Sequence, residues 1–174
     1  MKEVYLLDTN AFFNFIKYST ISLNDSSNGT IKEAIDKIKS STCCISLISK
    51  VEIISVIGKY ARGGAGANNK RMKPKVVKQW LKLVDELNSG RSPLLSLSTL
   101  AFTEKTITEA QIIVQNALLH NFGSLDAIIA ATAKECYSIK GYENTILITS
   151  DKGLKACLRS CGISHWDAFQ ENCI

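Results

Sequence analysis

The strongest constraint on the fold is the order in which short apolar runs alternate with helical segments along the chain. Four short runs are apolar or β-branched, and they cover Val4–Leu7, Cys43–Leu47, Leu94–Leu97 and Thr145–Thr149. The stretches between them, such as IKEAIDKIK and KVVKQWLKLVDEL, repeat their apolar residues with the 3.6-residue period of a helix. Strands that alternate with helices favour a parallel sheet, because each parallel connection needs a crossover that covers one face of the sheet. We therefore predict an α/β fold with a central parallel sheet of about four to five strands and helices on both faces.

The length of the chain and its few breakers indicate one domain. It has 174 residues and two prolines, and no polar linker divides it, so we expect a single domain over residues 1–174. Two segments rich in small polar residues or glycine, residues 19–30 and a basic insertion at about residues 61–75, are predicted to be flexible loops. No stretch approaches the roughly 18 consecutive apolar residues of a membrane helix, and the N-terminus lacks the pattern of a secretory signal. We expect a cytoplasmic protein that does not associate with membranes.

The cysteines are interpreted as free thiols. Six of them, Cys43, Cys44, Cys136, Cys157, Cys161 and Cys173, are irregularly spaced, and nothing points to secretion. Cys157 and Cys161 would share one face of a helix, but a zinc site needs further ligands, and the only histidines are the isolated His120 and His165. We therefore do not expect a structural zinc site.

Four acidic residues stand where predicted strands end or predicted helices begin. Asp8 follows the first strand, and Asp151 ends the last strand in LITSDKGL. Glu52 lies in the first turn of the apolar helix in SLISKVEIIS, and Asp126 lies in the first turn of the helix in GSLDAIIAATA. Since the carboxyl ends of parallel strands and the helix N-termini that follow them share one edge of a sheet, these four side chains should meet there.

Helix capping would also explain an acid at each of these places. Asp8 and Asp151 are candidate N-caps, and Glu52 stands three residues after Ser49, which is the spacing of a capping box. The segment from Thr103 to Ile139 is predicted to form two helices, with Gly123 as the stop signal of the first and Ser124 as the N-cap of the second; Asp126 would then complement the dipole of the second helix.

Capping and ligand binding both predict that the four acids cluster, so clustering alone does not separate the two. The repulsion between clustered carboxylates does, because it indicates that cations are needed among them. Carboxylates within several Å repel one another by a few kcal/mol per close pair at an effective dielectric constant of about 20, unless cations lie among them. Oxygen ligands without histidine or cysteine favour Mg²⁺ or Mn²⁺. Such sites activate water for attack on phosphodiester bonds and stabilise the leaving oxygen.

These four elements resemble the signature elements of the PIN domain, a metal-dependent ribonuclease fold. They are LLDTN near the start, Glu52 in a helix, DAIIAATA from Asp126 and LITSDKGL ending around Asp151. Their order and spacing are most similar to those of small prokaryotic VapC-type toxins, and the resemblance runs from about Val4 to His165. DAIIAATA carries much of it, because its alanines are small enough for the helix to approach the sheet closely.

The resemblance implies a role for each matching residue. It implies that Asp8, Glu52 and Asp126 are the principal metal-binding acids, that Asp151 is the fourth, and that the Thr149 hydroxyl orients an acid or a water molecule. The implied activity is that of an endoribonuclease that uses Mg²⁺ or Mn²⁺, and the similarity to VapC-type proteins implies the toxin of a toxin–antitoxin pair. The implied partners are an RNA substrate, an antitoxin protein and a second copy of the chain.

The distribution of basic residues is compatible with a nucleic acid partner. The net charge is +5, and the segment KRMKPKVVKQWLK, Lys70 to Lys82, contains no acid. This segment would contact RNA phosphates if it flanks the acidic edge, although a solvated loop and helix face explains it equally well. A PIN-like module that binds RNA or protein without cleaving is the alternative function; the presence of all four acids argues against it, because such a module has no need to tolerate their repulsion.

Overall fold

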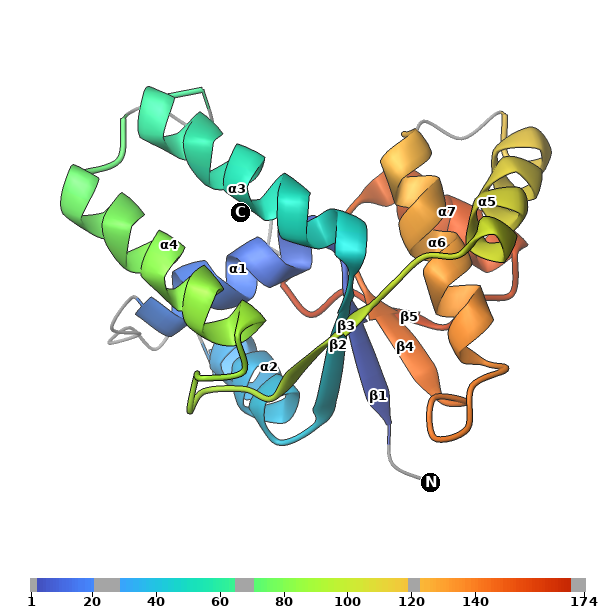
Figure 1. Ribbon diagram of the computed structural model, residues 1–174, viewed down its shortest axis with the longest axis horizontal. Helices are drawn as coiled ribbons and strands as arrows, with labels where there is room; N and C mark the ends of the chain where they lie inside the picture. Colours follow the sequence, from blue (N-terminus) through green and yellow to red (C-terminus); the bar gives the residue numbers. More distant parts are fainter. Residues whose placement is uncertain (1–2, 21–28, 65–70, 119–122, 170–174) are drawn as a thin grey trace.

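The computed structural model describes residues 3–20, 29–64, 71–118 and 123–169, and its elements alternate as the sequence predicts (Figure 1). In chain order they are β1 Val4–Leu7, α1 Thr9–Thr20, α2 Gly29–Lys39, β2 Thr42–Ser46, α3 Leu47–Arg62, α4 Pro74–Asn88, β3 Leu97–Leu100, α5 Glu104–Asn116, α6 Ser124–Cys136, β4 Thr145–Ile148, α7 Lys152–Ser160 and β5 His165–Trp166.

The sheet has five strands in the order β3-β2-β1-β4-β5, and every neighbouring pair is parallel. Helices α1 to α4 cover one face, and α5 to α7 cover the other (Figure 1). The predicted α/β fold with a parallel sheet and helices on both faces is therefore confirmed.

Alternation along β1 explains why both faces of the sheet are covered. Tyr5 and Leu7 belong to the core shared with α1 to α4, whereas Val4 and Leu6 belong to the core shared with α5 to α7. All four side chains are buried, as expected for a central parallel strand with a continuous apolar sequence. The central strand thus joins two hydrophobic layers.

The strand order creates a switch point between β1 and β4. The chain moves outward on one side from β1 through β2 to β3, and then returns to add β4 on the other side of β1. The connections that follow β1 and β4 therefore leave the sheet toward opposite faces. A crevice forms at such a point, outside the carboxyl ends of the two strands, and ligands of open α/β sheets bind there.

At the edges of the sheet, one predicted strand had the wrong bounds and another strand had not been located. The third strand is Leu97–Leu100 rather than Leu94–Leu97, because pairing with β2, in which Cys43 lies opposite Leu97, sets its register. Leu95 is buried although it lies in the connection before the strand. An apolar residue at a buried loop position looks like part of a strand in the sequence. The short strand β5 was not predicted, since two residues are too few to show a period.

The structure also corrects three predicted helix boundaries. Helix α3 begins at Leu47 with Ser46 as its N-cap, so Ser49 and Glu52 are interior residues and form no capping box. Gly123 is the N-cap of α6 rather than a stop signal, and Ser124 is the first residue of that helix rather than its cap. The preceding helix, α5, has already ended at Asn116.

Several predictions concern segments that the structure describes only in part. Most of the predicted loop at 19–30 and the centre of the insertion at about 61–75 lie outside the described residues, as do His120, Lys70 and Cys173. The five cysteines within the described ranges are free thiols, as predicted. Within these ranges, none of the helices combines the length and apolar character that crossing a membrane requires.

Candidate active site

Asp8 and Asp151 lie on either side of the switch point, where β1 and β4 end. The backbone N–H of Asp8 donates to the Ile148 carbonyl (3.1 Å), which extends the pairing of the two strands by one step. Asp8 Oδ1 accepts from the N–H of Ala11 at 2.5 Å, and Asp151 Oδ1 accepts from the N–H of Leu154 at 2.7 Å. Both acids therefore cap the helices that follow them, as predicted, and each cap occupies one carboxylate oxygen.

Thr149 connects these two acids. Its side chain is fully buried at the end of β4, and its hydroxyl accepts from the backbone N–H of Asp151 at 3.1 Å. The same hydroxyl forms a hydrogen bond with the Asp8 carboxylate, which lowers the pKa of Asp8. Thr149 thus holds the side chain of one acid and the backbone of the other in a fixed relation.

Glu52 reaches the site from the second turn of α3, since it is the sixth residue of that helix, counted from Leu47. Thr9, the first residue of α1, donates from its hydroxyl to Glu52 Oε2 at 2.6 Å. The Thr9 hydroxyl also lies 3.2 Å from the Ser49 hydroxyl, which is buried one turn before Glu52. This network joins the start of α1 to α3, and the position of Glu52 owes nothing to capping.

Asp126 enters from the opposite layer, at the third position of α6. Its Oδ2 accepts from the backbone N–H of Gly123 at 2.9 Å. The alanines that follow it, at positions 127, 130, 131 and 133, are fully buried. Small side chains at these positions let α6 pack closely against the sheet, which brings Asp126 to the edge where the strands end.

The electrostatics show that the four carboxylates form one cluster. Asp8 is only 3% exposed, and its pKa is raised to about 7, chiefly by burial and in smaller part by the charges of Asp126 and Asp151. Burial also raises the pKa of Asp126, and the charges of Asp151 and Glu52 add to that effect. Elements far apart in the sequence thus bring all four acids of the sequence prediction close enough to repel one another.

The donor chemistry of this cluster fits Mg²⁺ or Mn²⁺. All four side chains offer carboxylate oxygens, and a cation among them would offset both the mutual repulsion and the burial of Asp8. Across the described residues, however, no three histidine, cysteine, aspartate or glutamate side chains stand ready as ligands of one ion. One oxygen of each acid is held by a backbone N–H or, for Glu52, by the Thr9 hydroxyl. These four acids are the residues that could hold such an ion, and each still has one carboxylate oxygen that these hydrogen bonds do not use.

Ser46 is a further polar residue at this edge, which the sequence analysis did not identify. Its hydroxyl is fully buried and has no hydrogen-bond partner among the described residues. The register of β1 against β2, with Leu7 opposite Ile45, brings Ser46 beside Asp8. The sequence does place Ser46 directly before an apolar helix, where an N-cap is expected. The S-x-x-E spacing of Ser49 and Glu52 pointed instead to a helix start three residues later.

The basic residues of the predicted insertion lie at the far end of α3 and α4. Helix α3 rises about 15 Å between Glu52 and its last residue. The described members are Arg62, Arg71, Lys73 and Lys75, and Lys78 follows them on α4. All five are exposed, and no ion pair involves any of them within the described ranges.

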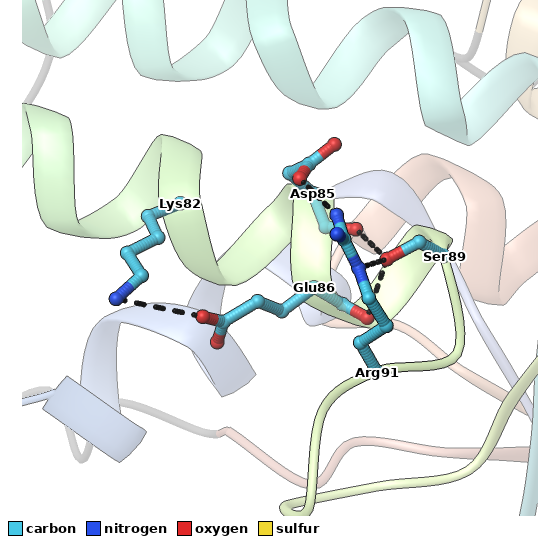
Figure 2. Close-up of polar contacts among 5 residues, drawn as sticks. All are labelled: Lys82, Asp85, Glu86, Ser89 and Arg91. Carbon is cyan, nitrogen blue, oxygen red and sulfur yellow. Dashed lines mark hydrogen bonds and ion pairs between the residues drawn. The ribbon is translucent and has the colours of Figure 1, made fainter.

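The opposite end of α4 carries its charges in pairs. Figure 2 shows Lys82 reaching Glu86, with their charged atoms 3.7 Å apart, and Arg91 reaching Asp85 at 2.8 Å. Arg91 also donates to the Ser89 hydroxyl at 2.8 Å. The unpaired positive charge of this helix is thus concentrated at its N-terminal end.

Comparison with known proteins agrees with this architecture. The PIN domain profile matches residues 5–157, nearly the whole chain, so this chain belongs to the PIN domain family. PIN domains are generally nucleases, which supports a hydrolase function. A search of curated proteins gave no match.

Among solved structures, the chain is similar to the crystal structure of FitAcB from Neisseria gonorrhoeae. The two are 17% identical, the match covers 94% of this chain and 97% of that chain, and the TM-score is 0.57. Identity at this level shows a shared fold.

Proposed function

We propose that this protein is an endoribonuclease that hydrolyses RNA phosphodiester bonds with Mg²⁺ or Mn²⁺. The observation that carries the proposal is the convergence of four carboxylates from both layers of the fold on the β1–β4 switch point, where the charges of neighbouring acids help to raise the pKa values of Asp8 and Asp126. Membership of the PIN domain family supports the same chemistry.

In this proposal Asp8, Glu52, Asp126 and Asp151 are the metal ligands. A bound Mg²⁺ or Mn²⁺ supplies a water of lowered pKa and stabilises the charge that develops on phosphate oxygens. The Ala11 N–H and the Thr149 hydroxyl hold the Asp8 carboxylate, and the Thr9 hydroxyl holds Glu52. These contacts reduce the freedom of the ligands before an ion binds, so less ordering remains to be done on binding.

The basic insertion at about residues 61–75 supplies phosphate contacts in this proposal. Its described cations are exposed and without ion pairs, which suits contact with a polyanion. The free thiols among the described residues suit a reducing compartment such as the cytoplasm.

The partners proposed are a second copy of the chain and an antitoxin protein, by resemblance to VapC-type toxins. One exposed stripe of α3 suits contact with a protein, because Leu47, Val51 and Ile54 follow one another at helical spacing and Val51 is 69% exposed. Antitoxin binding would then inhibit cleavage, and expression without the antitoxin would arrest growth.

The test is incubation of the purified protein with total cellular RNA in Mg²⁺ or Mn²⁺, followed by mapping of the cut ends. Cleavage should disappear in excess EDTA, return with either ion, and leave 5′-phosphate and 3′-hydroxyl ends. Asp126→Asn should abolish it, whereas Asp36→Asn, an exposed change on α2, should not. Undiminished cleavage in EDTA or cyclic phosphate ends would contradict the proposal.

A further inference from the structure

A cavity of about 610 Å³ opens directly beside the carboxylate cluster. Its walls come from α1, α3, the start of α7 and the segment after β5, and Asp151 lines it, so the cavity and the cluster are continuous. Its volume falls within the range of about 300–1,000 Å³ that is typical of small-ligand sites. None of the metal-binding roles proposed above requires this space.

Aromatic side chains form one wall of this cavity. Phe13 and Phe169 are buried, and the half-buried Tyr60 lies between the core and the cavity. The Tyr60 ring packs against Phe13 with centroids 4.6 Å apart, and against Trp80 in an edge-on contact at 5.8 Å. Tyr60 is thus a rigid ring in the cavity wall, and rigid rings are the surfaces on which nucleobases stack.

Two amide side chains form a second wall. Asn10 and Asn14 lie one turn apart on α1, and Asn10 is exposed. Hydrogen bonds from other described residues reach neither of these side-chain amides. Each amide offers one acceptor oxygen and two donor hydrogens. A base edge carries the same mixture of donors and acceptors, so these amides match a base better than they match an apolar ligand.

The two lysines of the cavity differ in their partners. Lys155 forms a largely buried ion pair with Asp167, so the positive charge of Lys155 is already balanced. Asp167 also accepts a hydrogen bond from the Ser150 hydroxyl at 2.6 Å. Lys152 is exposed, and none of the ion pairs found in the described ranges includes it. Its ammonium group is therefore available to a phosphate at the mouth of the cavity, next to Asp151.

The cavity also lies between the carboxylate cluster and the basic insertion. The backbone N–H of Met72 donates to the Tyr60 carbonyl at 3.1 Å, which places Arg71 and Lys73 beside the α3 wall of the cavity. A path from Asp151 past Tyr60 to Arg71 therefore passes from the acids, through a pocket with an aromatic wall, to unpaired cations. A single strand that follows this path would place one base at the cavity and its next phosphates against the cations.

We propose that this cavity is a nucleotide subsite, which receives the base adjacent to the scissile phosphate and determines cleavage preference at that position. Tyr60 stacks on the base, Asn10 and Asn14 hydrogen-bond to its edge, and Lys152 contacts its phosphate. The inference rests on the proposed ribonuclease function and adds to it a position at which the enzyme recognises a base.

The first test uses oligonucleotides in which each position flanking a mapped cut is replaced in turn by an abasic residue. With the wild-type protein, one position should show a loss in kcat/KM of roughly 5- to 150-fold, the effect expected from one stacked base. In Tyr60→Leu most of this difference in kcat/KM should disappear, because the variant should cleave the intact oligonucleotide as poorly as the abasic one. Tyr60→Phe should restore the difference, and Tyr142→Leu, a half-buried tyrosine outside the cavity, should retain it.

The second test measures binding without cleavage. Calorimetric titration with the four nucleoside 5′-monophosphates in EDTA should show a preference for one base, which Asn14→Ala weakens and Tyr60→Leu abolishes, with Lys152→Gln weakening all four. Thermal melting identifies any variant that fails to fold. If Tyr60→Leu is unfolded, Tyr60→Phe is compared with the wild type instead, and it should keep the same base preference.

The outcomes separate this proposal from the function on which it rests. Cleavage with an abasic penalty that is unchanged in Tyr60→Leu overturns the subsite and leaves the ribonuclease intact. No cleavage by the wild-type protein, together with Tyr60-dependent binding of monophosphates, supports the subsite and contradicts the ribonuclease. A cavity that instead receives a side chain of a protein partner would bind none of the monophosphates, and that result also overturns the proposal.

Discussion

Replacing Asp8 with asparagine should stabilise the metal-free protein at neutral pH while abolishing cleavage. Burial raises the pKa of Asp8 from 3.8 to about 7, so ionising this side chain costs more in the folded than in the unfolded chain. A raised carboxylate pKa means that wild-type stability falls as the pH rises from about 4 to about 7 and is level above that. Asparagine carries no charge and keeps an oxygen to accept from the Ala11 N–H, so the variant should lack this loss.

The magnitude follows from the two pKa values. Linkage gives a stabilisation by Asp8→Asn on the order of 4 kcal/mol at pH 8 and on the order of 2 kcal/mol at pH 5, falling to nearly zero below pH 3. For a chain of this size the value at pH 8 corresponds to a rise in Tm on the order of 10 °C. Cleavage should fall by orders of magnitude in the same variant, because a metal ligand is lost.

The assay is thermal unfolding of both proteins in EDTA at several pH values, repeated with Mn²⁺. The stability difference should grow with pH, and Mn²⁺ should stabilise the wild type more than the variant. Asp36→Asn, at an exposed site, should change the free energy of unfolding by no more than about 0.5 kcal/mol at any pH. A lower Tm for Asp8→Asn at pH 8 in EDTA would refute the reasoning, since the charged carboxylate would then be stabilising the fold.

Three further changes test other parts of the structure. Glu52→Gln keeps an oxygen to accept from the Thr9 hydroxyl and removes no cap, so cleavage should fall at least a hundredfold, measured at saturating RNA, while Tm changes little. Neutralising Arg71, Lys73 and Lys75 together should lower the slope of log K against log[salt] for single-stranded RNA by about 2, or roughly 0.7 per lost contact, measured by filter binding. Ala130→Leu should cost about 1–3 kcal/mol of stability in denaturant unfolding, because α6 packs closely on the sheet there.

Each of these predictions has its own contrary result. Cleavage by Glu52→Gln near the wild-type rate would remove that acid from the ligand set. An unchanged salt slope in the triple variant would mean that the insertion contacts a protein rather than RNA. For α6, Ile112→Ala on the exposed side of α5 is the control, and equal costs for it and Ala130→Leu would show that α6 is not closely packed.

Local patterns in the sequence were enough to predict the order of the helices and most strands, and the positions of Asp8, Asp126 and Asp151 along them. A continuous apolar run such as Val4–Leu7 belongs to a strand buried on both faces, and an acid directly after such a run stands at a strand end, because these are properties of neighbouring residues. Asp8 and Asp151 could be located at helix starts for the same local reason. The buried alanines of α6 likewise follow from their spacing, which puts small side chains on the faces that pack.

The tertiary structure alone decided which of these positions meet. Neither the strand order nor the register of β3 is encoded in a local pattern, because pairing partners are chosen by the packing of the whole sheet. The Thr9–Glu52 hydrogen bond joins residues 43 positions apart, which no local pattern could predict. Glu52 lies in an interior turn of α3 rather than in the expected capping box. The raised pKa of Asp8 arises from burial under elements contributed by the whole chain. The position of Tyr60 between the acids and Arg71 is also a product of packing, because it depends on how α3 and α4 lie against α1.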